Sequence, residues 1–251
     1  MSVLSIGLGL ADRGMLPDPI IRRGIRRLCV RRLGSLGSSN GEASRDFAQS
    51  MREGPIAPVP EAANEQHYEV PTDFYGLVLG PHRKYSGCHW PEGVTELADA
   101  EASALAQTCE RARLDDGQRI LELGCGWGSL SLWMAERYPN ASITAVSNSA
   151  SQRNYIEQRA LTRSLNNLRV ITADMNDFST DERFDRVVSV EMFEHMRNYE
   201  KLLARIASWL EDDGVLFVHV FCTRHAPYEF ETDGPANWMG RHFFTGGIMP
   251  S

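Results

Sequence analysis

The sequence predicts an α/β protein built on a doubly wound, mainly parallel sheet. Short apolar runs alternate with stretches of helix-forming residues from residue 119 to residue 221. The connections between them are short, which favours parallel strands with helices on both faces of the sheet. The first apolar run, at 119–123, leads at once into the glycine-rich stretch 124–128 and then into a helix-forming stretch. This is the arrangement of the first strand-turn-helix in such sheets.

Residues 1–63 are predicted to form an N-terminal region that precedes the sheet. A helix is expected from about Ile20 to Leu33, with apolar residues on one side and pairs of arginines on the other. Residues 34–60 are rich in Ser, Gly and Pro and are predicted to be a flexible linker. A second domain is predicted over residues 64–251.

Regular elements can be assigned along this second domain. Helices are expected at Thr72–Leu79 and at about Thr95–Leu114, ahead of the sheet. The predicted strands then lie at 119–123, 142–147, 168–173, 184–190 and 214–221, with helices at 149–164 and 199–210 among the connections. Ligands of doubly wound sheets bind outside the carboxyl ends of the strands, so the residues that follow the strands are the candidates for a site.

Charge is distributed unevenly along the 251 residues, whose formal net charge is −7 at pH 7. Residues 1–33 carry seven arginines against Asp12 and Asp18, a local balance of +5, so the remainder is −12. An acidic main body argues against nucleic acid as a partner. The basic N-terminal helix can lie on an anionic membrane, or pack on its own domain with its arginines solvated. A cleaved organellar presequence is a third reading, against which the two aspartates count.

Cysteine usage and hydropathy exclude further classes of protein. The five cysteines are odd in number and scattered, without a C-x-x-C pair: Cys29, Cys88, Cys109, Cys125 and Cys222. This favours a reducing, cytoplasmic location and argues against a disulfide framework or a zinc site, so no metal is expected. No run approaches 18 consecutive apolar residues, so no membrane span is predicted.

The glycine turn indicates which ligand the sheet binds. A dinucleotide site requires G-x-G-x-x-G, whereas here the third glycine comes one place early, and a phosphate-binding Walker loop requires Gly-Lys-Ser/Thr, which is absent. The pattern E-x-G-x-G-x-G, beginning at Glu122, is similar to the first motif of class I S-adenosylmethionine (SAM) methyltransferases. The alternative is a tight turn that binds nothing.

Several separated motifs in one order extend this resemblance. They are Tyr85-Ser86, the glycine turn, Ser147-Asn148-Ser149-x-x-Gln152 and Glu191-Met-Phe-Glu-His195. Residues 64–251 resemble the cyclopropane-fatty-acid-synthase branch of the class I SAM methyltransferases. Within that branch they are most similar to the coclaurine-type N-methyltransferases of plants and to bacterial relatives of those enzymes. The match through the arginine helix is weaker.

The resemblance implies a set of SAM-binding residues. Tyr85 and Ser86 would contact the methionine end, and Glu122, Gly124 and Gly126 belong to the turn that the cofactor approaches. Ser147, Asn148, Ser149 and Gln152 would hold the ribose, and Asp174 and Met175 would lie against the adenine. Two local alternatives stay open: Ser149-x-x-Gln152 is also a helix-capping pattern, and Asp174 can simply cap the next turn.

Three ionisable residues follow the fourth strand and are predicted to be catalytic: Glu191, Glu194 and His195. A carboxylate pair beside a cationic donor can orient an ammonium substrate, and a histidine has a suitable pKa to accept its proton. Glu191 and Glu194 would share a face if a helix began there. The alternative is that Glu194 only favours a helix N-terminus and that His195 has a structural partner.

The acceptor distinguishes the two branches that the chain resembles. The amine methyltransferases carry Glu at position 191 and the cyclopropane synthases carry Gly. The synthases also have Cys directly after Tyr-Ser, where this chain has Gly87 followed by Cys88. His219 matches a histidine of the synthases, and can equally be an ordinary strand histidine. The balance favours amine methylation. A metal site at Cys88-His89 is not expected.

The family continues about 100 residues beyond Ser251, so a chain truncated at its C-terminus, with strand 214–221 as a bare edge, is expected. Three functions follow. The first is a SAM-dependent methyltransferase acting on a small amine. The second is a cyclopropane-synthase-type enzyme acting on an unsaturated lipid acyl chain. The third is a truncated, non-catalytic SAM-binding relative.

Overall fold

The computed structural model describes residues 3–35, 41–60 and 72–251. The chain divides into two compact units. The larger runs from Met51 to Phe221, and the smaller combines Met1–Ser50 with Cys222–Ser251. The predicted domain boundary between residues 63 and 64 lies outside the described residues.

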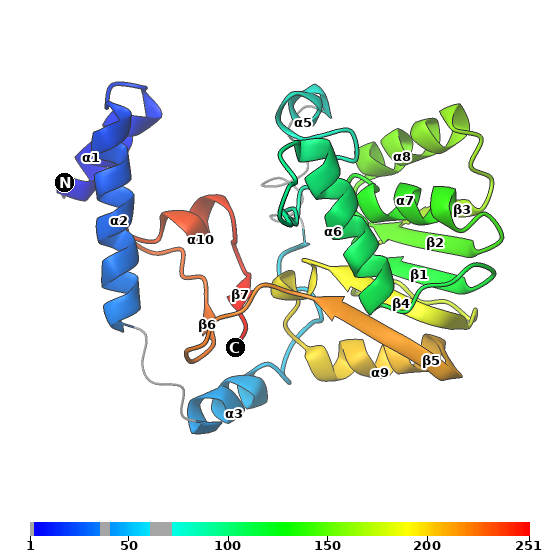
Figure 1. Cartoon of the computed structure of the whole chain (residues 1–251). Coiled ribbons are helices and arrows are strands. Elements are labelled where there is room, and N and C mark those ends of the chain that lie inside the picture. The colour runs from blue at the N-terminus through cyan, green and yellow to red at the C-terminus, as the bar shows by residue number, and fades with distance from the viewer. Residues whose placement is uncertain (1–2, 36–40, 61–71) are drawn as a thin grey trace. The chain divides into compact units, whose positions relative to one another are not determined.

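A five-stranded sheet forms the centre of the larger unit (Figure 1). Its order is β3-β2-β1-β4-β5, and every neighbouring pair is parallel. The strands are β1 (Arg119–Leu123), β2 (Ser142–Ser147), β3 (Leu168–Thr172), β4 (Phe184–Val190) and β5 (Leu210–His219). The predicted doubly wound parallel sheet is therefore confirmed. The main difference is at β5, which begins four residues before the predicted start at Gly214.

The helices of this unit also agree with the predicted ones, with ends that move by three residues at most. They are α5 (Thr72–Val78), α6 (Leu97–Arg111), α7 (Ser129–Arg137), α8 (Ala150–Thr162) and α9 (Tyr199–Trp209). A short 3₁₀ turn, η1 (Phe193–His195), follows β4. A helix beginning at Glu191 was considered from the sequence, but the 3₁₀ turn starts only at Phe193.

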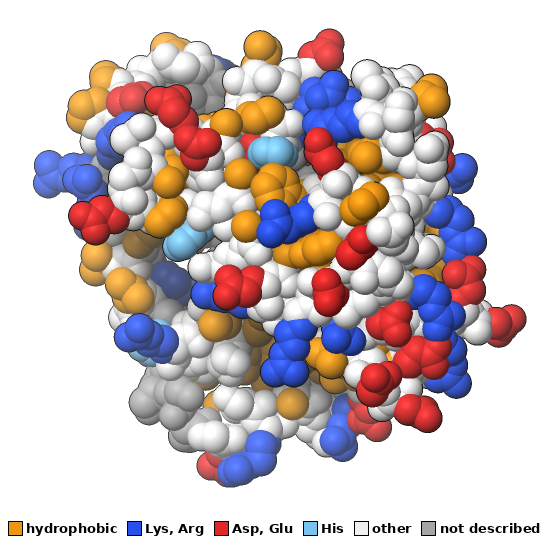
Figure 2. Space-filling view, turned by 45° about the vertical axis from the view of Figure 1, so that its right-hand side comes forward, with side chains coloured by type: hydrophobic (Ala, Val, Ile, Leu, Met, Phe, Trp, Pro, Cys, Tyr) orange, Lys and Arg blue, Asp and Glu red, His pale blue; other side chains and the backbone are white. Residues whose placement is uncertain are grey.

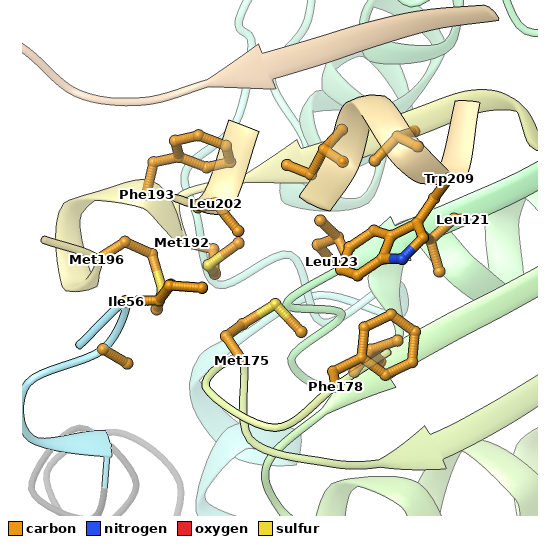
Figure 3. Packing of buried hydrophobic residues seen from close by; sticks show 14 of the residues in the cluster. Ile56, Leu121, Leu123, Met175, Phe178, Met192, Phe193, Met196, Leu202 and Trp209 are labelled. Carbon is orange, nitrogen blue, oxygen red and sulfur yellow. The ribbon is translucent and has the colours of Figure 1, made fainter. Parts of the chain in front are cut away.

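Alternation along the central strands divides the core between the two faces of the sheet. Leu121 and Leu123 pack with Trp209 and other residues of α9, and Figure 3 shows Met175 and Met192 joining this layer. Ile120, one position out of phase, packs on the opposite face with residues of α6 and α7. The alternating pattern places helices on both faces, so the ligand-binding edge is formed by the turns at the carboxyl ends of the strands.

Part of the region predicted to be a linker is ordered in the structure. Residues Gly41–Ser50 form helix α3. Ile56 and Ala57 are buried in the core layer of Figure 3. Asn176 donates to the Ala57 carbonyl at 2.9 Å and accepts the Ala57 N–H at 3.0 Å. The expectation of a flexible linker does not hold for residues 41–50, which form α3, or for residues 52–57, which distant polar side chains bind.

The smaller unit contains α1 (Val3–Asp12), α2 (Asp18–Ser35), α3, β6 (Tyr228–Glu229), α10 (Trp238–His242) and β7 (Ile248–Met249). The two short strands pair antiparallel. The Arg32 guanidinium lies 4.1 Å from the Tyr228 ring centroid, which joins α2 to the β6 segment. The predicted arginine helix is confirmed as α2. Its Ile20, Ile25 and Val30 are exposed, and contact with a membrane stays a prediction.

Within the described ranges, no helix is long and apolar enough to cross a membrane. Figure 2 shows positive and negative side chains intermixed over the face that it presents, without a continuous basic surface. That an acidic chain has no nucleic-acid partner stays a prediction.

Candidate active site

The glycine turn after β1 provides a cradle for a ligand. Gly124 has φ +78°, and a Cβ there would come within 2.6 Å of Met192 Cγ. A Cβ on Gly128 would likewise lie 2.5 Å from Ile156 Cγ1. Gly126 differs, because a Cβ there would meet no described atom within 4 Å. Packing therefore requires the first and third glycines, whereas the middle one leaves its backbone accessible to a ligand.

Glu122 is buried directly beneath this turn and accepts a hydrogen bond from Ser131 Oγ. Burial raises the pKa of its carboxyl to about 7, against the opposing effects of the Ser131 hydroxyl and the Lys84 ammonium. Glu122 therefore changes charge near neutral pH.

The end of β2 carries a polar cluster. Ser147 Oγ donates to Gln152 Oε1 at 2.6 Å, and the Ser149 N–H donates to Ser147 Oγ at 3.0 Å. Ser149 caps α8 by accepting the Gln152 N–H at 3.4 Å, so the capping reading is confirmed. Gln152 Nε2 is buried and has no acceptor in the described part of the chain. An unpartnered buried donor at this edge suits a ligand hydroxyl.

The remaining candidates around this cluster have partners of their own. Asn148 Nδ2 donates to the Pro60 carbonyl at 3.3 Å. Asp174 Oδ1 accepts the Asn176 N–H at 2.6 Å, which is the turn-capping alternative raised from the sequence. Met175 is buried in the core layer, as Figure 3 shows. The adenine contacts of Asp174 and Met175 stay predictions.

Tyr85 and Ser86 lie on the loop between α5 and α6. Tyr85 is 44% exposed, and its ring makes an edge contact with Tyr75 at 5.6 Å. Tyr75 in turn contacts Trp127 of the glycine turn at 5.1 Å. The structure thus joins Tyr85 to the β1 turn through a chain of aromatic rings.

The three predicted catalytic residues follow β4. Glu191 has φ +53°, a left-handed conformation that is uncommon outside glycine, and its N–H donates to the His219 carbonyl at 2.8 Å. Glu194 is 1% exposed, and its Oε1 accepts the Phe221 N–H at 3.1 Å. His195 is half-buried in the 3₁₀ turn. The turn, and not a shared helical face, brings the two carboxyl groups together.

Burial, together with the neighbouring Glu191, raises the pKa of Glu194 to about 8. At neutral pH Glu194 is therefore mostly protonated, which limits the repulsion between the two carboxyl groups. On the solvent side, His219 Nε2 lies 3.6 Å from Glu191 Oε1. His219, whose role the sequence leaves open, thus lies beside the Glu191–Glu194 pair.

The cofactor-binding candidates after β1 lie next to the catalytic candidates after β4. Met192, which follows Glu191 directly, packs against Gly124 of the glycine turn. β1 and β4 are also hydrogen-bonded neighbours in the sheet. A ligand against the β1 turn and an acceptor at the β4 end therefore meet at the same edge. In the ranges that the structure describes, no three His, Cys, Asp or Glu residues gather as a metal site would require.

Sequence reasoning missed two buried charged residues near this edge, Lys84 and Glu101. Burial lowers the pKa of the Lys84 ammonium, whose Nζ donates to Ser86 Oγ at 2.8 Å. Glu101 has no exposed surface. A signal existed for Glu101, because it lies four residues after Leu97 and four before Leu105, on the apolar side of its helix.

Comparison with known proteins identifies the family. The mycolic acid cyclopropane synthetase family matches residues 59–251. The chain belongs to this family. It is 38% identical over 242 residues to (S)-coclaurine N-methyltransferase of Thalictrum flavum subsp. glaucum, covering 95% of this chain and 67% of that protein.

Two further members of the family place the fold and the branch. The crystal structure of coclaurine N-methyltransferase bound to N-methylheliamine and S-adenosylhomocysteine (SAH) matches with a TM-score of 0.93 at 36% identity, over all of this chain and 74% of the other. The cyclopropane-fatty-acyl-phospholipid synthase of Escherichia coli strain K12 is 30% identical over 189 residues, which are 74% of this chain and 46% of that one. These matches confirm the class I methyltransferase fold, the branch and, for the family, SAM-dependent methyl transfer.

Proposed function

We propose that this chain transfers the methyl group of SAM to the nitrogen of a small amine. The observation that carries the proposal is the Glu191–Glu194 carboxyl pair, which adjoins the glycine turn and includes a partly exposed and a buried carboxyl group. Carboxyl groups beside a cationic methyl donor can orient an ammonium group. The 38% identity to a coclaurine N-methyltransferase supports the same acceptor class.

The cofactor edge fits SAM by its own chemistry. Open space at Gly126 allows a ligand to lie against the backbone, and the unpartnered Gln152 Nε2 suits a ribose hydroxyl. Ser147, Asn148 and Ser149 complete the ribose side. Tyr85 and Ser86 lie toward the methionine end, with Glu122 and Gly124 beneath, and Asp174 and Met175 toward the adenine. When bound, SAM supplies a methyl group that its sulfonium has already activated.

The residues after β4 orient the acceptor and receive its proton. Glu191 is partly exposed and presents its carboxyl group to the ammonium, while the raised pKa of the buried Glu194 limits the repulsion between the two carboxyl groups. His195 accepts the proton that the amine releases. The amine nitrogen would then be neutral and able to accept the methyl group that bound SAM supplies.

A second candidate is methylene transfer to an unsaturated lipid acyl chain. It is favoured by one observation, the position of His219 at 3.6 Å from Glu191, since a histidine of the cyclopropane synthases stands at the matching position. The exposed apolar residues of α2 would suit a lipid surface. The presence of Glu at 191 weighs against this candidate.

Product analysis separates these functions. The chain is incubated with SAM and either heliamine, the unmethylated form of N-methylheliamine, or vesicles of a monounsaturated phospholipid, and products are examined by proton NMR. A new N-methyl signal supports the proposal. Loss of the olefinic protons instead establishes the lipid reaction. SAH binding by calorimetry without either product would count against both reactions with these acceptors and would favour a non-catalytic SAM-binding protein.

A further inference from the structure

Glu101 on α6 is a buried carboxylate that lies outside the set of residues assigned above. Its side chain has no exposed surface. Oε1 accepts the Gly80 N–H at 2.9 Å and the Lys84 N–H at 3.1 Å, and Oε2 accepts the His82 N–H at 2.8 Å. A buried carboxylate is tolerated only when donors compensate it, and here all three come from the backbone of a single loop.

That loop approaches Glu101 closely and has an irregular backbone. A Cβ on Gly80 would lie 2.5 Å from Glu101 Oε2, so only glycine fits there. Arg83 has φ +49°, and its N–H closes a turn to the Gly80 carbonyl at 3.0 Å. A left-handed arginine is unfavourable by itself, so the surrounding contacts must hold this conformation.

The same loop carries Tyr85 and Ser86. The last of the three N–H groups bound by Glu101 belongs to Lys84, directly before Tyr85. Lys84 Nζ then donates to Ser86 Oγ at 2.8 Å. Side chains dock the loop on neighbouring helices, with His82 against Trp133 at 5.1 Å and Arg83 over Tyr155 at 4.2 Å. Among these contacts, those with Glu101 are the ones that fix the backbone.

We propose that Glu101 is a positioning residue, which holds residues 80–86 in the conformation that presents Tyr85 and Ser86 to SAM. The inference rests on the proposed SAM contacts of those two residues. The site requires a carboxylate, since an amide offers one acceptor oxygen and turns an N–H₂ group toward a backbone N–H. Glutamine at this position therefore leaves at least one buried amide of the loop without a partner.

The test is Glu101→Gln in the full chain, with Glu110→Gln at the exposed end of the same helix as the matched control. Titration calorimetry with SAH should show affinity about tenfold weaker for Glu101→Gln and unchanged for Glu110→Gln. With an acceptor in hand, KM for SAM should rise while kcat at saturating SAM is retained. Native SAH affinity in Glu101→Gln would overturn the inference.

Hydrogen exchange provides a second readout that does not require the variant to fold. In the SAH-free wild-type chain, the amides of Gly80, His82 and Lys84 should be protected, because Glu101 already binds them. Exchange of these amides at the rate of an exposed loop would overturn the inference. A wild-type chain that binds no SAH would refute the proposed function instead, while the exchange data would still decide whether Glu101 anchors the loop.

Discussion

At the carboxyl ends of β1 and β2, the candidate site consists of backbone and neutral polar groups around one buried carboxyl, that of Glu122, whereas at the end of β4 it consists of several ionisable side chains held close together. In the first region the backbone fits its surroundings, because Gly124 and Gly128 fit their neighbours and Ser149 caps its helix. In the second region the backbone itself is strained, because Glu191 adopts a left-handed conformation. Each region holds one buried carboxyl with a raised pKa, Glu122 in the first and Glu194 in the second.

The difference teaches where function opposes stability in this fold. A left-handed residue other than glycine costs about 1 kcal/mol, and a buried carboxyl that lacks compensating donors favours its neutral form. Such features persist when the surrounding structure holds them, and they concentrate at sites that bind or react. Substitutions in the residues after β4 should therefore be able to increase stability at the expense of activity, whereas substitutions in the β1 turn should not.

The largest expected effect is on catalysis. Glu191→Gln should lower kcat for amine methylation by about 10²- to 10⁴-fold, because the carboxylate that orients the ammonium is removed. SAH affinity should change little, because the cofactor edge is built from other residues. Steady-state kinetics and calorimetry measure the two quantities, with Glu110→Gln as the control. Equal losses in kcat and SAH affinity would show that the two regions are not separable.

The next effect concerns pH. The folded pKa of Glu194 lies at about 8, above its ordinary value of 4.5, so the native state keeps a proton that the unfolded chain loses. Stability should therefore fall as pH rises through this interval. Glu194→Gln keeps a neutral side chain at all pH values. The free energy of unfolding of this variant, relative to that of the wild type, should therefore increase by about 3 kcal/mol between about pH 5 and pH 8. Glu122 contributes a similar slope, which both proteins retain.

Urea unfolding at several pH values gives these free energies. Glu136→Gln, an exposed position on α7, is the control and should follow the wild-type pH dependence. A constant difference between Glu194→Gln and the wild type at all pH values would contradict a neutral Glu194.

The glycine turn offers a contrast within the β1 region. Gly124→Ala should destabilise the chain by about 3 kcal/mol, because the new Cβ meets Met192 and the backbone φ is positive. Gly126→Ala should cost only about 1 kcal/mol, from φ alone, yet weaken SAH binding at least tenfold by filling the ligand's space. Chemical unfolding and calorimetry on both variants decide this. Similar SAH affinity in Gly126→Ala and the wild type would contradict the prediction that the cofactor lies against Gly126.

The smallest effect tests the backbone conformation at the β4 end. Glu191→Gly should raise the free energy of unfolding by about 1 kcal/mol, since glycine adopts a positive φ without strain, while amine methylation is lost. Arg113, an exposed residue with φ +54°, supplies a control at which Gly should stabilise without changing activity. Loss of stability in Glu191→Gly would show that Glu191 contributes more through its contacts than its conformation costs.

Local patterns explain how much of this molecule the sequence could predict. The strands were placed closely because each is an apolar run ended by glycine or polar residues, and the positions of Glu191, Glu194 and His195 followed from the end of β4. Residues 52–57 do not form the expected linker, because Asn176 and Asn198 bind this segment from more than 100 residues away. No local pattern contains such contacts.

The left-handed conformation of Glu191 was also beyond the sequence. Nothing about a glutamate after a strand signals a positive φ, and the conditional expectation of a shared helical face depended on an ordinary backbone there. Helical spacing indicates that Glu101 is buried, but the three backbone amides that it binds leave no mark in side-chain patterns. In each case the cause is a long-range or backbone contact.

The pairing of Ala57 with Asn176 has a consequence for synthesis of the chain. Ile56 and Ala57 leave the ribosome well before Asn176 and Arg197, which hydrogen-bond to them in the folded chain. During that interval their apolar surface has no native partner, so residues 51–57 remain undocked. Completing the core requires closing a loop across three strands, which should make docking of residues 51–57 a late step in folding.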